Sequence, residues 1–446
     1  MGSPEGRHAR GVAGRPSHAR LALSSFHSPW FLIPQGTGSV ALVLHQLDYR
    51  FRGLDTISVI FWVAAIALLA ATCALYLCRL AAARPSPRAA LRAVASDTSE
   101  AACLASVSVA FMSIVQMLAL VVVPGPWGGR SWAVVVYVLW WVNCGLAVAA
   151  CLFIPLIFVH SIHAEGGFIN CLTPSTQLPL IAALTSAAGA GTLCAATASG
   201  PFLTPAEKVP MIIVAYLEVG LGLPLAIALD ILFIARVLSP WETETGAEPL
   251  VGAQVFSEMV SCGPWGQTSF GLQALGAALL SLNGKLGAAQ PGQTERVLLT
   301  DDAMRPLGYA SMLVGLTLWG QGTFWWTFAV VSIGRSFVNH FRSKPPMQFA
   351  VSVWAIVFPW VDTPRLVWLG CVCEDANWVN VGGLYKRRCA AGEAARLARL
   401  SRLVHGPGYY ARHHMASLRG LYAQGGFSWH TFGTPEGVEA AQRRQC

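Results

Sequence analysis

The sequence predicts an all-α protein that crosses a membrane many times. Of its 446 residues, 54% are hydrophobic and only 12% are charged, and its mean hydropathy is +0.52. A soluble protein of this length does not carry so apolar a composition. The fold class is therefore a polytopic helical membrane protein.

The apolar residues gather in stretches that are long enough to cross a bilayer. A transmembrane helix needs about 20 predominantly apolar residues. Nine stretches of the sequence are candidates, and short polar loops separate them. These predicted spans are about 30–46, 56–79, 102–124, 132–159, 176–198, 210–235, 250–282, 307–333 and 348–361.

The net charge of +8 does not indicate a nucleic-acid partner. The basic residues lie in short loops and tails beside the spans, as the positive-inside rule describes for membrane proteins. Residues 1–25 form a basic tail in which no apolar core follows the arginines, which argues against a cleaved secretory signal. We expect this tail to be cytosolic, and the partner of the helices to be the lipid bilayer.

Several function classes are disfavoured by what the sequence lacks. None of the twelve cysteines forms a CxxC pair, and no Cys/His cluster has zinc spacing, so we interpret the cysteines as packing residues. A membrane enzyme should show a His-box or an acid pair on one helix face, and neither is visible. Nine spans also disfavour a seven-helix receptor. We expect no enzyme activity, cofactor or metal.

The stretch Cys262–Gly276 (CGPWGQTSFGLQALG) places helix-breaking residues inside an apolar span. Pro264 has no amide hydrogen, and glycine leaves the backbone uncovered. In a bilayer such a segment survives only where protein buries it or where it lines a watery cavity. The stretches Trp30–Gly38 and Phe349–Pro359 have the same character, so we predict that all three line a pathway.

These breaks alternate along the chain. Spans one, five, seven and nine contain Pro, Gly or polar breaks, whereas spans two, four and eight are nearly plain. We predict that odd spans line a central pore and that even spans face lipid, as a ring of helical hairpins. Packing is the alternative explanation, because glycine and proline are common in membrane helices. The candidate lining or kink residues are Gly36, Gly38, Pro179, Gly263, Pro264, Gly266, Gln267, Phe358 and Pro359.

Three motifs resemble one transporter family over about residues 26–361. They are WFLIPQGTG near the start, LTPSTQLP before span five, and GPWGQTSFGLQALG in span seven. This set resembles the tellurite-resistance and dicarboxylate transporter family, which includes plant slow anion channels, fungal malate permeases and fungal sulfite efflux pumps. The span-seven motif is the most specific and looks closest to the sulfite efflux branch.

The resemblance implies ten helices in a quasi-fivefold arrangement, with kinked odd helices around a pore. It also implies that a phenylalanine of helix nine obstructs the pore. By its position in the motif Phe349 is the candidate gate, and Phe358 lies on the same helix. A homo-oligomer, trimeric in relatives, is implied as well.

The resemblance implies a plasma-membrane anion transporter that exports sulfite or bisulfite. The alternative is a C4-dicarboxylate (malate) permease or an anion channel of the same family. We expect weak attraction of the anion by amides, hydroxyls and helix ends. Gln267 and Gln116 could donate to the anion or could bridge neighbouring helices. The candidate attracting groups are Thr37, Ser39, Gln267, Thr268 and Ser269.

Two acids lie within the predicted sixth span. A charge inside a membrane costs several kcal/mol and by default indicates a functional site. Glu218 and Asp230, however, fall in a covering span, and carboxylates would repel an anion. We interpret them as locally paired or exposed at the interface.

The sequence departs from the family at Gln35, where methionine is usual, at Val353, which replaces a tryptophan, and beyond residue 361. Residues 362–446 form a basic polar tail with no apolar stretch long enough to be a tenth span. Nine spans from a cytosolic start would place this tail outside, against the charge rule. We hypothesise that a retained intron or a shifted reading frame has replaced the tenth helix.

Overall fold

The computed structural model describes residues 23–47, 50–83, 86–162, 172–197, 202–238, 252–283, 301–343 and 351–358, all within the first of two units, Met1–Glu374. In these ranges the chain is helical and contains no strand. Most of the predicted amino-terminal tail and all of residues 362–446 lie outside them, as do Phe349 and Pro359.

Every predicted span contains at least one helix. Short helical pieces also occur at the ends of the spans and in one loop. In chain order the elements are the 3₁₀-helix η1 (Ser28–Phe31), α2 (Leu32–Gln46), α3 (Leu54–Ala82), α4 (Pro87–Ser96), α5 (Thr98–Cys103), α6 (Ser106–Met117), the π-helix η2 (Leu118–Val122), α7 (Arg130–Ile162), the 3₁₀-helix η3 (Pro174–Gln177), α9 (Leu178–Ala196), α10 (Pro205–Leu238), the 3₁₀-helix η5 (Gly252–Cys262), α11 (Gly263–Leu282), α12 (Asp301–Ser343) and the 3₁₀-helix η7 (Val351–Ile356).

Five helical stretches in the described residues are long and apolar enough to cross a membrane by length and composition. They correspond to predicted spans two to six and include α3, α6, α7, α9 and α10. These helices confirm the predicted class, an all-α membrane protein.

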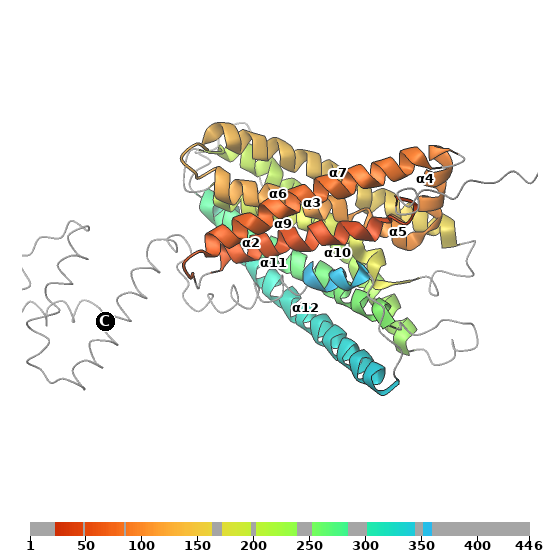
Figure 1. The fold of residues 1–446 in the computed structure, drawn as a ribbon. Helices are drawn as coiled ribbons and strands as arrows, with labels where there is room; N and C mark the ends of the chain where they lie inside the picture. The colour runs from red at the N-terminus through yellow and green to blue at the C-terminus, as the bar shows by residue number, and fades with distance from the viewer. Residues whose placement is uncertain are drawn as a thin grey trace, which may run out of the picture. The chain divides into compact units, whose positions relative to one another are not determined.

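The odd spans contact one another in a closed circuit. Helix α2 packs against α6, α6 against α9, and α9 against α11. The circuit closes because η5, which leads into α11, contacts η7, and η7 contacts α2. Figure 1 shows α2 beside its hairpin partner α3. We call α2, α6, α9, η5 with α11, and η7 the inner ring.

Burial separates inner from covering helices as predicted. In their most apolar windows, the stretch containing α9 is 94% buried and the stretch containing α6 is 67% buried. The corresponding figures for the covering helices α3, α7 and α10 are 22%, 28% and 33%. The exposed apolar side chains of the covering helices are those expected to face lipid.

The prolines of the inner helices α9 and α11 lie at the helix starts, whereas the sequence predicted breaks within these spans. Pro179 and Pro264 lie in the first turns of α9 and α11, directly after the 3₁₀-helices η3 and η5. Proline is tolerated there because the first amide hydrogens of a helix have no partner within it. The span-seven break is thus a junction between a 3₁₀-helix and an α-helix. Interior prolines occur in covering helices, at Pro155, Pro210, Pro224 and Pro306.

Small residues bring α9 and α11 together. A Cβ atom on Gly191 of α9 would lie 2.7 Å from the Cβ of Ala274 on α11. A Cβ on Gly271 of α11 would lie 3.2 Å from the Cα of Ala188 on α9. Each helix therefore uses a glycine to accept an alanine of the other, which is the close approach expected from the run of small residues in span five.

Candidate functional site

The described candidate residues all belong to the inner ring or directly follow η7, and all are buried. Gly36 and Gly38 lie on α2, Pro179 lies in the first turn of α9, and Phe358 follows η7. The residues Gly263, Pro264, Gly266 and Gln267 lie in the first turns of α11.

Two of the glycines lie where the residues that follow η7 approach the other inner helices. A Cβ atom on Gly36 would lie 3.1 Å from Cγ1 of Val357. A Cβ on Gly263 would lie 2.7 Å from Cδ1 of Ile181 and 3.8 Å from Cε1 of Phe358. The structure thus brings parts of α2, α9, α11 and the end of η7 into contact.

Apolar side chains of α2, α6, α9, η5 and η7 meet with Phe358 in one buried cluster. The cluster also includes side chains of α5 and α7. Phe358 is only 4% exposed within it. We call this set the ring cluster, and its inner-ring members include Leu32, Val109, Ile181, Val260 and Phe358.

The hydroxyls expected to attract an anion are already engaged. Thr37 donates to the Ile33 carbonyl at 2.8 Å, and Ser269 donates to the Gly315 carbonyl of α12 at 2.6 Å. A hydroxyl that donates to a carbonyl has no further proton to offer an anion. The same pattern holds for Ser39 on the Gln35 carbonyl and Thr268 on the Pro264 carbonyl.

The buried glutamines were predicted either to donate to an anion or to bridge neighbouring helices, and the contacts of Gln116 distinguish the two. Its Nε2 donates to Oγ1 of Thr192 on α9 at 3.2 Å. Gln116 therefore bridges two inner helices. Gln267 is 5% exposed on α11.

Asp230 of α10 connects two of the sequence motifs, LTPSTQLP before α9 and GPWGQ at the start of α11. Its Oδ1 accepts a hydrogen bond from Nε2 of Gln177, in the LTPSTQLP stretch. Its Oδ2 accepts from the indole Nε1 of Trp265, in the GPWGQ stretch, at 2.6 Å. Asp230 is only 3% exposed, so the prediction of local pairing is right for it and that of interfacial exposure is wrong.

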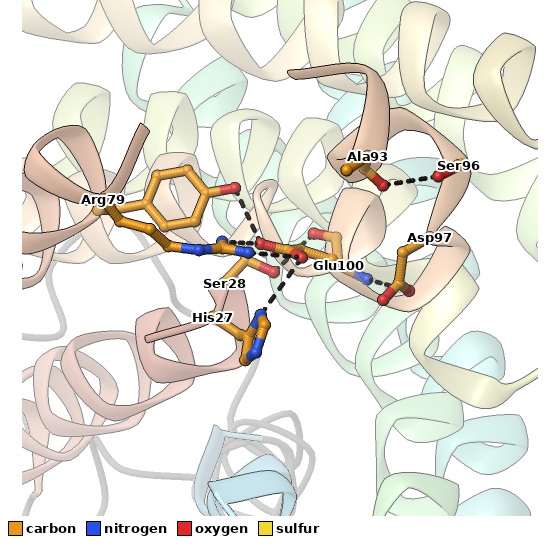
Figure 2. Close-up of polar contacts among 8 residues, drawn as sticks. His27, Ser28, Arg79, Ala93, Ser96, Asp97 and Glu100 are labelled. Carbon is orange, nitrogen blue, oxygen red and sulfur yellow. Dashed lines mark hydrogen bonds and ion pairs between the residues drawn. The ribbon is translucent and has the colours of Figure 1, made fainter. Parts of the chain in front are cut away.

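A second polar cluster surrounds Glu100 of α5, as Figure 2 shows. Arg79 of α3 donates to its carboxylate, and Tyr76 donates to Oε1 at 3.2 Å. Nδ1 of His27 lies 3.4 Å from Oε2, and the hydroxyl of Ser28 donates to the Glu100 backbone carbonyl at 2.6 Å. This Glu100 cluster joins the segment before α2 to α3 and α5.

Two further buried acids differ from Asp230 and Glu100 in their surroundings. Glu218 of α10 is 1% exposed, so the prediction of interfacial exposure is wrong for it, and its polar neighbours are the Ser186 hydroxyl and the Cys144 thiol. Glu258 of η5 is 7% exposed and interacts with Ser332 of α12. Glu258 is not among the residues predicted from the sequence, although an acid inside an apolar span is itself a signal.

The described elements of the inner ring contain neither Lys nor Arg. Among all the described residues, no three His, Cys, Asp or Glu side chains come together as metal ligands. An interior without fixed positive charge matches channels that let an anion enter and leave, since a strong fixed cation would bind the anion tightly.

Comparison with known proteins places this architecture in a family. A profile of the voltage-dependent anion channel family matches residues 25–362. Sulfite efflux pumps of Arthroderma benhamiae and Trichophyton rubrum are each 25% identical over 366 residues, covering 80% of this chain and 86% of the relative. A malic acid transport protein of Schizosaccharomyces pombe is 23% identical over 364 residues, covering 80% of this chain and 72% of the relative. The chain belongs to the voltage-dependent anion channel family.

Proposed function

We propose that this protein exports sulfite or bisulfite across the plasma membrane through the interior of the inner ring. The proposal combines the family assignment with the names of the relatives that cover most of the chain. The substrate comes from this likeness, because many transporters with one fold carry different solutes.

One observation carries the proposal: the five inner elements contact one another in a closed circuit whose described residues include neither Lys nor Arg. An anion in this interior would meet amides and helix ends instead of fixed cations. The junctions of η3 with α9 and of η5 with α11, where the helix type changes, are the candidate positions for such backbone groups. Weak attraction favours throughput over tight binding.

The ring cluster is the proposed gate. Phe358 packs there beside Ile181 and Gly263, so its ring would have to move for an anion to pass. Phe349 remains the candidate from the motif, and it lies outside the described residues. Substitution of each phenylalanine separately distinguishes the two assignments.

The inside-negative membrane potential would drive export, because it repels an anion from the cytosol. This requires a plasma-membrane location with the amino terminus in the cytosol, as the arginines of the first tail indicate. Assembly as a homo-oligomer is part of the proposal. Light scattering of the purified protein in detergent measures it.

A dicarboxylate permease is the second candidate. Two relatives from Schizosaccharomyces pombe, a malic acid transport protein and a putative one, cover 80% and 75% of this chain. A second carboxylate would need extra cationic or hydroxyl groups. The hydroxyls of Thr37, Thr268 and Ser269 are already bonded to carbonyls, which favours the smaller anion.

Expression of the full chain in cells that lack their own sulfite exporter tests the proposal. We expect restored growth on sulfite and no uptake of labelled malate. Malate uptake without sulfite tolerance would favour the permease. Neither activity, with the protein present at the cell surface, would contradict both candidates.

A further inference from the structure

Glu218 lies deep within the membrane-spanning part of α10. The helix runs from Pro205 to Leu238, so Glu218 lies about 20 Å from one end and about 30 Å from the other, at about 1.5 Å per residue. Its side chain is 1% exposed. It therefore faces the protein interior although it belongs to a covering helix.

The groups around Glu218 do not compensate a charge. Its polar neighbours are the Ser186 hydroxyl of α9 and the Cys144 thiol of α7. Neither the carboxyl oxygens nor the Ser186 hydroxyl makes a hydrogen bond to another described residue. Trp140, one turn before Cys144, donates to the Ser186 carbonyl at 3.0 Å and holds α7 against α9 at this position.

The titratable groups that face Glu218 are the thiols of Cys144 and Cys151 on α7. On α9, Cys194 lies eight residues beyond Ser186, and the sequences of η3 and α11 contain no titratable residue. Each of the other titratable residues of α10 makes a hydrogen bond to a group other than Glu218. Glu207 binds Arg130, and Lys208 binds carbonyls of α9 and its C-cap. Tyr216 binds Ser311, Asp230 binds Gln177 and Trp265, and Arg236 binds the Leu172 carbonyl. Glu218 differs from all of them.

An ionised carboxylate in such surroundings would cost several kcal/mol, because its polar neighbours are a hydroxyl and a thiol and no cationic side chain of the described residues faces it. The neutral acid avoids most of this cost. Ionisation would require α10 to separate from α7 and α9, so that water can reach the carboxyl.

We propose that Glu218 is a proton-binding site whose loss of a proton accompanies a movement of α10 against α7 and α9, so that transport depends on pH. The proton passes from the carboxyl oxygen to water when the helices separate and returns when they pack again. This inference goes beyond the proposed function, since it concerns a proton and does not depend on which anion is carried.

Infrared spectroscopy of the full protein in lipid detects the neutral acid directly. The carbonyl stretch of protonated carboxyl groups should lose intensity in Glu218→Gln relative to the parent and keep its full intensity in Glu207→Gln, a control on the same helix. Glu218→Asp should shift the band without removing it, and it serves if the Gln variant does not fold. Identical carboxyl bands in parent and Glu218 variants would overturn the proposal.

Sulfite flux into liposomes supplies the second readout. Between about pH 5 and about pH 9, a range that brackets buried carboxyl titration, the parent should change its rate several-fold. Glu218→Gln should change its rate less than the parent does, and the change that remains reports the titration of the substrate between bisulfite and sulfite. An equal pH profile in both proteins would overturn the coupling. If neither protein transports sulfite, the proposed substrate is contradicted. The infrared result still decides whether Glu218 binds a proton.

Discussion

Trp265 donates its indole N–H to Oδ2 of Asp230 over 2.6 Å, and this hydrogen bond joins an inner helix to a covering helix. The same carboxylate accepts a hydrogen bond from Gln177, next to the start of α9. One buried acid thus holds the starts of two inner helices. Its role is positional, because both oxygens are engaged by protein donors.

Asp230→Ala should therefore destabilise the fold. It leaves the Gln177 amide and the Trp265 indole buried without their acceptor, which should lower the free energy of unfolding by about 2–5 kcal/mol. Asp230→Asn, which keeps one acceptor oxygen, should lie between parent and Ala. Thermal unfolding in detergent measures the change. Asp55→Ala, at a site whose side chain is 63% exposed, is the control, and an equal loss in both Ala variants would contradict the positional role.

Two arginine–carboxylate pairs at different depths should respond differently to truncation. Arg79→Ala leaves Glu100, whose side chain is 7% exposed, without its main partner, at a cost of about 2–4 kcal/mol. Arg50→Ala removes an exposed pair with Asp55 and should cost less than about 1 kcal/mol. Melting temperatures of the two variants measure the contrast. Similar shifts would show that the Glu100 cluster is not a stabilising hub.

Glycine substitutions test the close packing of the inner ring. Gly191→Ala should destabilise by about 1–3 kcal/mol, because its Cβ would crowd the backbone of the opposite helix. The relevant atoms are C of Ala274 and N of Leu275, each 2.9 Å away. In Gly145→Ala, on α7, the new Cβ would meet nothing within 4 Å, and helix propensity should make it neutral or stabilising by up to about 1 kcal/mol. Thermal unfolding decides, and a stabilising Gly191→Ala would refute the close approach.

Phe358→Ala should raise anion flux if the ring cluster is the gate. The deletion opens space beside Ile181 and Gly263, and the current through planar bilayers measures the effect. Phe324→Ala on α12, where the side chain is 51% exposed, should leave the current unchanged. An increase with Phe349→Ala but not with Phe358→Ala would move the gate to the residue favoured by the motif.

The sequence predicts the inner and outer positions of the helices because the bilayer restricts where backbone can be uncovered. The stretch around Gly263 and Pro264 could not face lipid, and it is buried as expected. Helix ends are less predictable. Helix α12 extends to Asp301–Ser343, beyond the predicted 307–333, because hydropathy marks the membrane thickness and not the end of hydrogen bonding.

Side-chain partners could not be read from the sequence. Trp265 lies 35 residues from Asp230, and Gln177 lies 53 residues from it, so only the packing of three helices brings them together. The same holds for the hydroxyls, since a serine on an inner helix can turn to its own backbone or to a neighbour. Ser269 turns to Gly315 of α12.

Reconstitution of the purified chain into liposomes, with a potential that is negative on the side of sulfite loading, tests most directly whether the inner ring carries a small anion. We predict sulfite efflux that grows with the potential and rises further in Phe358→Ala. Efflux no greater than from protein-free liposomes, from correctly folded protein, would contradict the account.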